Sequence, residues 1–245
     1  MEPGLVEANF AALSTRIRIG TSGWSYPAWV GPFYPAGTSA AKMLPAYAQT
    51  FTTVEAHATY RRLPTAAALA KWRTQVPDEF RFALKAHIGI THRRDTDGLD
   101  ERVAAFAASV EPLGDRTGPV LFVLPHHQPD LDRLDLLLAA VTGRPLEAVF
   151  ELAPGWRIDP VYERLAQAGA SLAAIDRDGE PVAEPRGPVA YVRLRRSTYA
   201  EDDLDAWARR LDGYAQAGRA VYAFLKHDEG GDGPRYARAL VGKLP

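Results

Sequence analysis

The chain has 245 residues, 47% of them hydrophobic and 24% charged, so it can bury a complete core. Its formal net charge of −1 argues against a globally basic protein that coats nucleic acid, but it leaves room for a local cationic pocket. The lack of cysteine excludes disulfide-linked partners, thiolate nucleophiles and cysteine-ligated metals.

The first sixteen residues are interpreted as an amino-terminal extension. They carry acidic residues where a signal peptide needs positive charge, and no later segment approaches a membrane span. We therefore expect a cytoplasmic protein without a membrane partner. Residues 17–245 contain no linker-like stretch or internal repeat, which predicts a single domain.

Strand and helix patterns alternate along the chain. Short apolar or alternating runs predict eight strands, at 17–20, 53–60, 80–87, 119–125, 148–152, 171–176, 189–195 and 220–227. Helical patterns lie between most of them; four begin after the capping residues Ser39, Thr65, Asp130 and Asp202, and three cover 99–113, 159–168 and 234–241. The alternation predicts parallel strands with right-handed crossovers, and the count of eight predicts an α/β (β/α)8 barrel of the TIM type.

One connection departs from this pattern. Residues 178–188 are too rich in proline and glycine for a normal helix, so an irregular connection is expected between the sixth and seventh strands.

Strand parity places polar side chains inside the predicted barrel. Because successive side chains point to opposite faces, Glu55 and His57 share one face of the second strand, opposite its apolar residues. The same alternation with apolar neighbours is found for Lys85 on the third strand and for Arg193 and Arg195 on the seventh. The sequence therefore predicts a charged pocket at the carboxyl ends of the strands, where barrel active sites lie.

Chemical roles follow from these residue types. Glu55 and Glu151 are the predicted general acid and base, and His92 is a predicted proton shuttle at the rim. Lys85, a further catalytic candidate, would hold an anion together with Arg193 and Arg195, since lysine offers a point charge and arginine a planar fork of donors. The alternative interpretation is an ion-pair network that only fills the barrel.

Two other features leave alternatives open. The loop Thr21–Pro35 is rich in aromatic residues, which either stack on a planar ligand or plug the mouth with their own rings. The six histidines fall at or beyond strand ends, and with Glu55, Glu151 and Asp176 they offer ligands for a divalent metal. Their spacing is not that of a compact metal motif, so no metal or other cofactor is predicted.

Five segments together resemble the YecE-like family, a family of unknown function (domain of unknown function 72). They are IRIGTSGWSYPAWVGPFYP, TVEAHATYRRLP, FRFALKAHIGITH, GPVLFVLP and YVRLRRSTY. The resemblance spans nearly the whole chain and implies a TIM-type barrel, in agreement with the strand count. Taken with the pocket, it adds further predicted ligand contacts at Thr21, Ser22, Trp24, His57, Thr59, Arg62 and Lys226.

The chain is a divergent member by this comparison. His57 stands where the family has Asn, Tyr60-Arg61 replaces Phe-Tyr, and ELAPGW at residues 151–156 is shorter than the family's EFRHPSW. FLKH at 224–227 replaces FFNN. These changes put in doubt whether an activity of the family is retained here.

The favoured hypothesis is a barrel that binds or processes a phosphate-bearing ligand, such as a nucleotide, a nucleic-acid end or a sugar phosphate. If it is an enzyme, a hydrolase is expected. The alternatives are a non-catalytic ligand-binding or scaffold barrel, and a metal-dependent endonuclease-like or glycosidase-like hydrolase. Direct pairing of both carboxylates with Arg or Lys would argue against a glycosidase.

Overall fold

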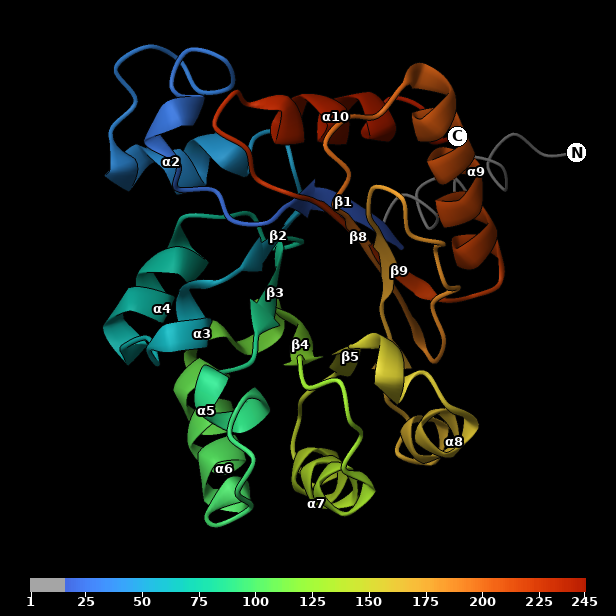
Figure 1. Ribbon diagram of the computed structural model, residues 1–245. Helices are drawn as coiled ribbons and strands as arrows, with labels where there is room; N and C mark the ends of the chain where they lie inside the picture. Colours follow the sequence, from blue (N-terminus) through green and yellow to red (C-terminus); the bar gives the residue numbers. More distant parts are fainter. Residues whose placement is uncertain (1–15) are drawn as a thin grey trace, which may run out of the picture.

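A computed structural model describes residues 16–245 (Figure 1). Residues 1–15, most of the predicted extension, lie outside the described part. Within residues 16–245 the strands are β1 (Ile17–Thr21), β2 (Thr53–Ala56), β3 (Arg81–Lys85), β4 (Thr117–Leu124), β5 (Ala148–Leu152), β6 (Ser171–Leu172), β7 (Ala174–Asp176), β8 (Val189–Leu194) and β9 (Ala220–Leu225). They match the positions of the eight predicted runs, with the sixth run divided in two.

Helices follow most strands. The α-helices are α2 (Ala40–Tyr47), α3 (Ala58–Arg61), α4 (Ala66–Thr74), α5 (Ile88–Thr91), α6 (Leu99–Val110), α7 (Leu131–Thr142), α8 (Asp159–Gln167), α9 (Glu201–Gln216) and α10 (Asp232–Val241). Three 3₁₀ segments are η1 (Pro27–Trp29), η2 (Glu111–Arg116) and η3 (Pro154–Trp156). The larger helices surround the strands in Figure 1, so the chain has the predicted mixed α/β class.

The strands form two parallel sheets. Their orders are β1-β9-β8-β7 and β2-β3-β4-β5-β6, and every strand pair is parallel. Two features connect the sheets: Ser22, after β1, forms a parallel bridge with Glu55 of β2, and Ala173 alone separates β6 from β7 along the chain. The predicted strand over 171–176 is thus shared, its first half pairing with β5 and its second half with β8.

The irregular connection has a local structural role. Between β7 and β8 the chain contains no helix, and Arg186 forms an antiparallel bridge with Leu172. Their backbone groups make reciprocal hydrogen bonds, with N···O distances of 2.9 and 3.2 Å. The proline- and glycine-rich stretch therefore returns to the sheet as a loop.

Two local predictions were wrong. The strand predicted over 53–60 ends at Ala56, because His57 adopts helical backbone angles (φ −94°, ψ −6°) and begins α3. Helix α9 begins at Glu201 and not after Asp202, because the Asp203 carboxylate accepts the backbone N–H of Ala200 at 3.0 Å. The predicted caps Thr65 and Asp130 do accept backbone N–H groups, from Ala68 at 3.2 Å and Arg133 at 3.0 Å respectively, whereas Ser39 precedes α2 without such a bond.

The core has two clusters that follow strand parity. The larger one lies between strands and helices and includes Phe82 and Val192, both fully buried. The smaller one consists of Ala83, Leu121, Val149, Ala173, Ile175, Val189, Tyr191, Tyr222 and Phe224. Each buried large apolar side chain contributes about 1.5–3 kcal/mol. Alternation therefore puts Lys85 and Arg193 on the side of the small cluster, directly above Ala83 and Tyr191, as predicted.

No helix among residues 16–245 combines the length and apolar character needed to cross a bilayer.

Candidate functional site

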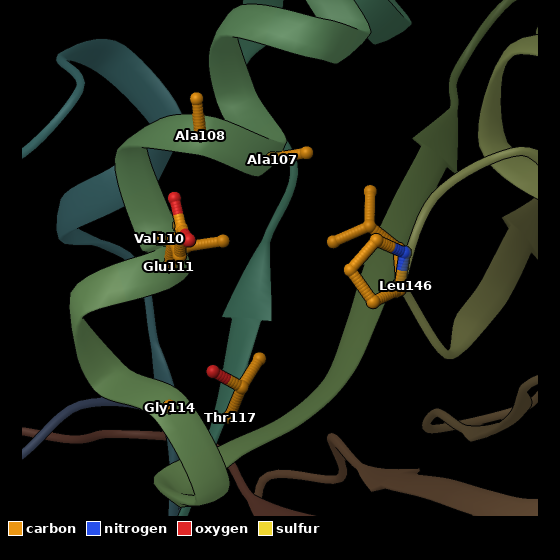
Figure 2. Close-up of a pocket in the computed structure, with 8 residues that line it drawn as sticks. Ala107, Ala108, Val110, Glu111, Gly114, Thr117 and Leu146 are labelled. Carbon is orange, nitrogen blue, oxygen red and sulfur yellow. The ribbon is translucent and has the colours of Figure 1, made fainter.

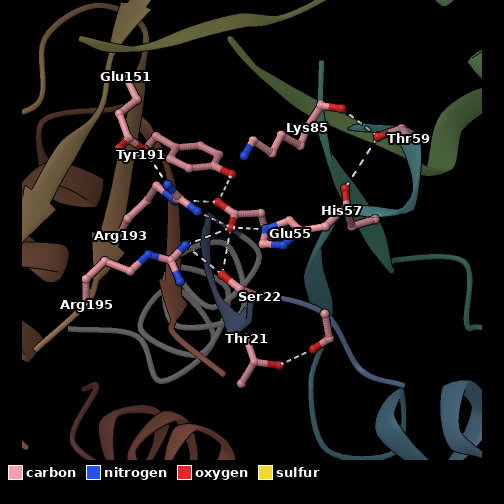
Figure 3. Close-up of polar contacts among 12 residues, drawn as sticks. Thr21, Ser22, Glu55, His57, Thr59, Lys85, Glu151, Tyr191, Arg193 and Arg195 are labelled. Carbon is pink, nitrogen blue, oxygen red and sulfur yellow. Dashed lines mark hydrogen bonds and ion pairs between the residues drawn. The ribbon is translucent and has the colours of Figure 1, made fainter. Parts of the chain in front are cut away.

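The Glu55 carboxylate is the centre of a buried polar cluster at the carboxyl ends of β2 and β8 (Figure 3). Its side chain is fully buried, and five side chains donate to it. Ser22 Oγ, His57 Nε2 and Arg195 Nη2 lie 2.6, 2.7 and 2.8 Å from Oε1, and Arg193 Nη2 lies 2.8 Å from the same atom. Arg193 Nε and the Tyr191 hydroxyl reach Oε2 at 2.9 and 2.8 Å. We call these six residues the Glu55 cluster.

Glu151, at the carboxyl end of β5, extends the cluster. Arg193 Nη1 donates to its Oε2, and Arg177 Nη2 lies 2.8 Å from its Oε1. Arg193 therefore bridges two buried carboxylates that come from different strands. Such pairing satisfies charges that would be costly to bury alone.

Both carboxylates are held in the ionised form. Burial opposes ionisation of Glu55, but Arg193 and Arg195, with the hydrogen bond from His57, hold the pKa of Glu55 well below its usual range. Burial likewise opposes ionisation of Glu151, and Arg193 and Arg177 lower its pKa. A carboxyl group with such a pKa is a poor proton donor near neutral pH.

Lys85 lies beside this cluster without joining its ion pairs. Its Nζ is 3.9 Å from the centre of the Tyr60 ring, a cation–π contact, and Figure 3 shows the amine pointing toward the Glu55 cluster. Within residues 16–245, Lys85 has no carboxylate within ion-pair distance. Burial, followed by the positive charge of Arg193, lowers the pKa of the amine.

His92 is linked to Tyr60 and not to the Glu55 cluster. Its Nε2 is 3.1 Å from the Tyr60 hydroxyl, and its Nδ1 is 2.8 Å from Thr91 Oγ1. Burial and the nearby Lys85 charge lower the pKa of His92, so the ring is neutral near pH 7. The predicted rim histidine therefore forms a hydrogen-bonded pair with a tyrosine that contacts Lys85.

The remaining predicted ligand contacts lie in varied surroundings. Thr59 Oγ1 donates to the backbone oxygen of Lys85 at 2.6 Å, and Thr21 Oγ1 is bonded to Gly23 O and Tyr47, so both hydroxyls are engaged within the protein. Trp24 packs edge-on against Trp72, with ring centres 4.9 Å apart.

Arg62 is exposed. Lys226 lines a small pocket with Arg196 and Asp228, next to the start of α10. Neither side chain contributes to the Glu55 cluster.

The aromatic loop packs mainly on itself. Trp29 is fully buried and donates to the backbone oxygen of Asp228 at 2.8 Å, while Tyr34 is 2% exposed and donates to Trp24 O. Tyr26 stacks on His227, with ring centres 4.6 Å apart and planes 3° from parallel. Of the two interpretations, the packing agrees better with the plug. Ser22 joins the loop to the Glu55 cluster, and the Tyr26 hydroxyl donates to the backbone oxygen of Ser22 at 2.8 Å.

Tyr191 and Arg177 were not among the predicted site residues, although strand parity gives a signal for both. Tyr191 precedes Arg193 by two residues and belongs to the small inner cluster. Arg177 follows β7 with the parity of Ile175, another member of that cluster. Parity within the predicted seventh strand already places Tyr191 on the face of Arg193, and extending the rule one residue beyond the sixth strand places Arg177 on the inner face.

A larger pocket lies at the opposite ends of the strands. It has a volume of about 460 Å³ and is lined by the end of α6, η2, the first residue of β4 and the segment before β5 (Figure 2). Most of its lining is apolar, from Ala107, Val110 and Leu146 among others, with Glu111 as its charged residue. No predicted site residue lines it.

In the described part of the chain, no three His, Asp or Glu side chains lie together in a metal-binding arrangement.

Fold and site together define a mixed α/β protein of parallel strands with an ion-pair cluster at their carboxyl ends. Residues 18–245 match the model of the family described as "Protein of unknown function DUF72", so the chain belongs to this family. The resemblance inferred from the sequence motifs is thereby confirmed.

Curated relatives match over part of their length. The UPF0759 protein YecE of Escherichia coli K12 is 34% identical over 109 residues, which cover 44% of this chain and 38% of that protein. The UPF0759 protein YunF of Bacillus subtilis is 33% identical over 115 residues, 44% of this chain and 40% of its own length. The matched region is thus well under half of each relative.

Solved structures of the family share the fold. A DUF72 family protein from Thermotoga maritima has a TM-score of 0.74 at 22% identity, covering 92% of this chain and 98% of its own. One from Enterococcus faecalis has a TM-score of 0.76 at 18% identity, covering 93% and 95%. At these identities the likeness concerns the fold alone.

Proposed function

We propose that residues 17–245 form one closed (β/α)8 barrel domain whose mouth binds a phosphate-bearing anion. Closure is supported by the bridge between Ser22 and Glu55 at one edge of the two sheets. It is supported at the other edge by the strand that β5 and β8 share. In such a barrel the carboxyl ends of the strands form the mouth, and the Glu55 cluster lies there.

A surplus of positive charge at the mouth carries the proposal. Four cationic side chains, Lys85, Arg177, Arg193 and Arg195, face two carboxylates, which leaves two positive charges over. Glu180 reaches Arg177 only at 3.8 Å and is exposed. A dianionic phosphate would compensate this surplus, and guanidinium groups match its oxygens in geometry and charge.

Arg195 is the proposed direct contact. Its side chain is 13% exposed, and its Nη2 is bonded to Glu55 and Ser22, which orients the guanidinium. Its Nε is buried, and none of residues 16–245 accepts a hydrogen bond from it. Lys85 strengthens the positive field.

Binding is proposed here in preference to hydrolysis. Glu55 accepts from five side chains and Glu151 from two arginines, so neither carboxylate is available to take or give a proton. The same pairing does not favour the glycosidase alternative, because one of its two carboxyl groups must start protonated. The role of the two carboxylates is to position Arg193 and Arg195.

Titration of inorganic phosphate into the protein, followed by calorimetry, tests the proposal. Arg195→Gln removes the guanidinium group. It is expected to weaken phosphate binding by about tenfold or more, since a charged hydrogen bond contributes about 1.5–3 kcal/mol. Arg164→Gln is the matched control, because Arg164 forms an exposed pair with Asp135 at 2.8 Å and should leave binding unchanged. Absence of saturable binding to the wild type, or equal affinity in both variants, would refute the proposal.

A further inference from the structure

Lysine is rare in this chain, and its placement is informative. The sequence has five lysines, Lys42, Lys71, Lys85, Lys226 and Lys243, among 29 basic residues counted as Lys plus Arg. Arginine forms nearly all the ion pairs of the described residues, and Lys243 is the one lysine that takes part in them. Arginine cannot lose its proton at accessible pH, whereas a lysine amine can.

Lys85 differs from Lys243 in its surroundings. Lys243 Nζ lies 2.7 Å from both Glu201 and Asp205, which raise its pKa and keep it charged. Lys85 sits on the Tyr60 ring, with Arg193 and Arg195 as electrostatic neighbours. Burial and the arginine charges lower its pKa, although Glu55 and Glu151 act in the opposite direction. A lowered pKa makes a lysine amine more nucleophilic near neutral pH.

An acid–base pair adjoins the amine. The Tyr60 ring contacts Lys85 Nζ, and the Tyr60 hydroxyl is 3.1 Å from His92 Nε2. His92 is neutral near pH 7, since burial and the Lys85 charge lower its pKa, and a neutral imidazole can accept or relay a proton. Thr59 Oγ1 donates to the backbone oxygen of Lys85 at 2.6 Å, so the main chain of the lysine is held at the end of β3.

We propose that Lys85 forms an imine with an aldehyde or ketone that bears a phosphate group. The ligand class rests on the proposed function for its anionic part alone: Arg195 would bind the phosphate while the carbonyl carbon meets Lys85 Nζ. The amine itself is assigned from its position on Tyr60, beside the Tyr60–His92 pair and outside the ion pairs.

The bond changes balance as follows. The Nζ lone pair forms a C–N bond to the carbonyl carbon, and the electrons of the C=O π bond move to oxygen, which takes a proton. The first proton that nitrogen loses passes to this oxygen, which gives a carbinolamine. The nitrogen lone pair then forms the C=N bond as the C–O bond breaks, and the departing hydroxyl group takes the second nitrogen proton and leaves as water. The Tyr60–His92 pair relays the proton that the departing oxygen needs.

Reductive trapping with pyridoxal 5′-phosphate and borohydride tests the inference on the full chain. Hydride from borohydride converts the imine to a stable secondary amine, and peptide mass mapping then reports which of the five lysines is modified. Lys85 is expected to react at least about tenfold faster than exposed Lys71, because a lysine desolvated beside a cation is an activated nucleophile. Modification of Lys71 or Lys226 at a rate equal to or above that of Lys85 would overturn the inference.

Pyridoxal, which has the aldehyde without the phosphate, separates the two proposals. Slower trapping of Lys85 by pyridoxal than by pyridoxal 5′-phosphate supports both the imine and the phosphate site. Equal trapping at Lys85 by both aldehydes supports the imine and counts against phosphate binding. No preference for Lys85 with either aldehyde, while inorganic phosphate still binds, rejects the imine and keeps the phosphate site.

Tyr60→Phe tests the relay. It keeps the ring under the amine but removes the hydroxyl bonded to His92, and it is expected to slow trapping at Lys85 by about tenfold or more with phosphate affinity unchanged. Lys85→Arg keeps the positive charge but has no reactive amine, so the fast modification should be lost. A Tyr60→Phe rate equal to that of the wild type would remove the tyrosine from the mechanism.

Discussion

The two ends of the parallel strands differ in what lies there: paired, buried charges at one end and an open, largely apolar pocket at the other. At the carboxyl ends, Glu55 and Arg193 are buried charges whose hydrogen-bonding atoms are engaged by close neighbours. At the amino ends of β4 and β5, a pocket of about 460 Å³ is lined largely by small apolar side chains such as Ala107. The carboxyl ends therefore depend on the pairing of buried charges, whereas the amino-end pocket is a surface depression whose lining residues are mostly partly or fully exposed.

Breaking the Glu55 cluster should have the largest effect on stability. Glu55→Gln removes the negative charge and leaves Arg193 and Arg195 buried beside a neutral amide, so we expect a loss of about 3–5 kcal/mol in the free energy of unfolding. Urea unfolding followed by circular dichroism measures it. Asp135→Asn, which breaks the exposed pair with Arg164, is the control and should lose no more than about 1 kcal/mol. Similar losses in the two variants would show that the buried cluster contributes no more to the free energy of unfolding than an exposed ion pair.

Acid should weaken the carboxyl ends before the apolar amino ends. The folded-state pKa values of Glu55 and Glu151 are lowered from 4.5, so their contribution to stability is complete above that value and declines as the pH falls toward the folded pKa values. We expect the wild type to lose stability below about pH 4.5, by up to about 1.4 kcal/mol per pH unit for each carboxyl group. Unfolding midpoints measured in urea between pH 7 and pH 3 provide the test.

The variant Glu55→Gln sharpens this measurement, because it removes one of the two titrating groups. Its stability should fall less steeply with acid than that of the wild type. Equal slopes would assign the acid sensitivity to other carboxyl groups.

Filling the amino-end pocket should have the smallest effect. Ala107→Leu adds apolar surface next to Leu146, and we expect a change within about 1 kcal/mol in the free energy of unfolding, with phosphate affinity unchanged. Thermal unfolding and phosphate titration give the two readouts. A loss of phosphate binding would show that the two ends of the strands are energetically coupled and would contradict the contrast between them.

The sequence by itself determined the alternation of strands and helices and the polar parity of each strand. Both are local properties: alternation sets which face Lys85 and Arg193 occupy, whatever strand lies next to them. The same rule failed at His57, because the chain turns into α3 after Ala56, yet the histidine still reaches Glu55. Local pattern therefore identified most members of the cluster.

Only the tertiary structure decided which charges meet. Arg193 lies 138 positions after Glu55, and their pairing depends on how the two sheets are joined at Ser22 and at the divided strand. Coulomb attraction and hydrogen bonding act over a few ångströms, so no spacing in the sequence encodes them. For the same reason, the sequence predicted that Lys85 lies near the other charged residues but could not predict its partner. In the structure its amine contacts the Tyr60 ring and forms no ion pair with the described residues.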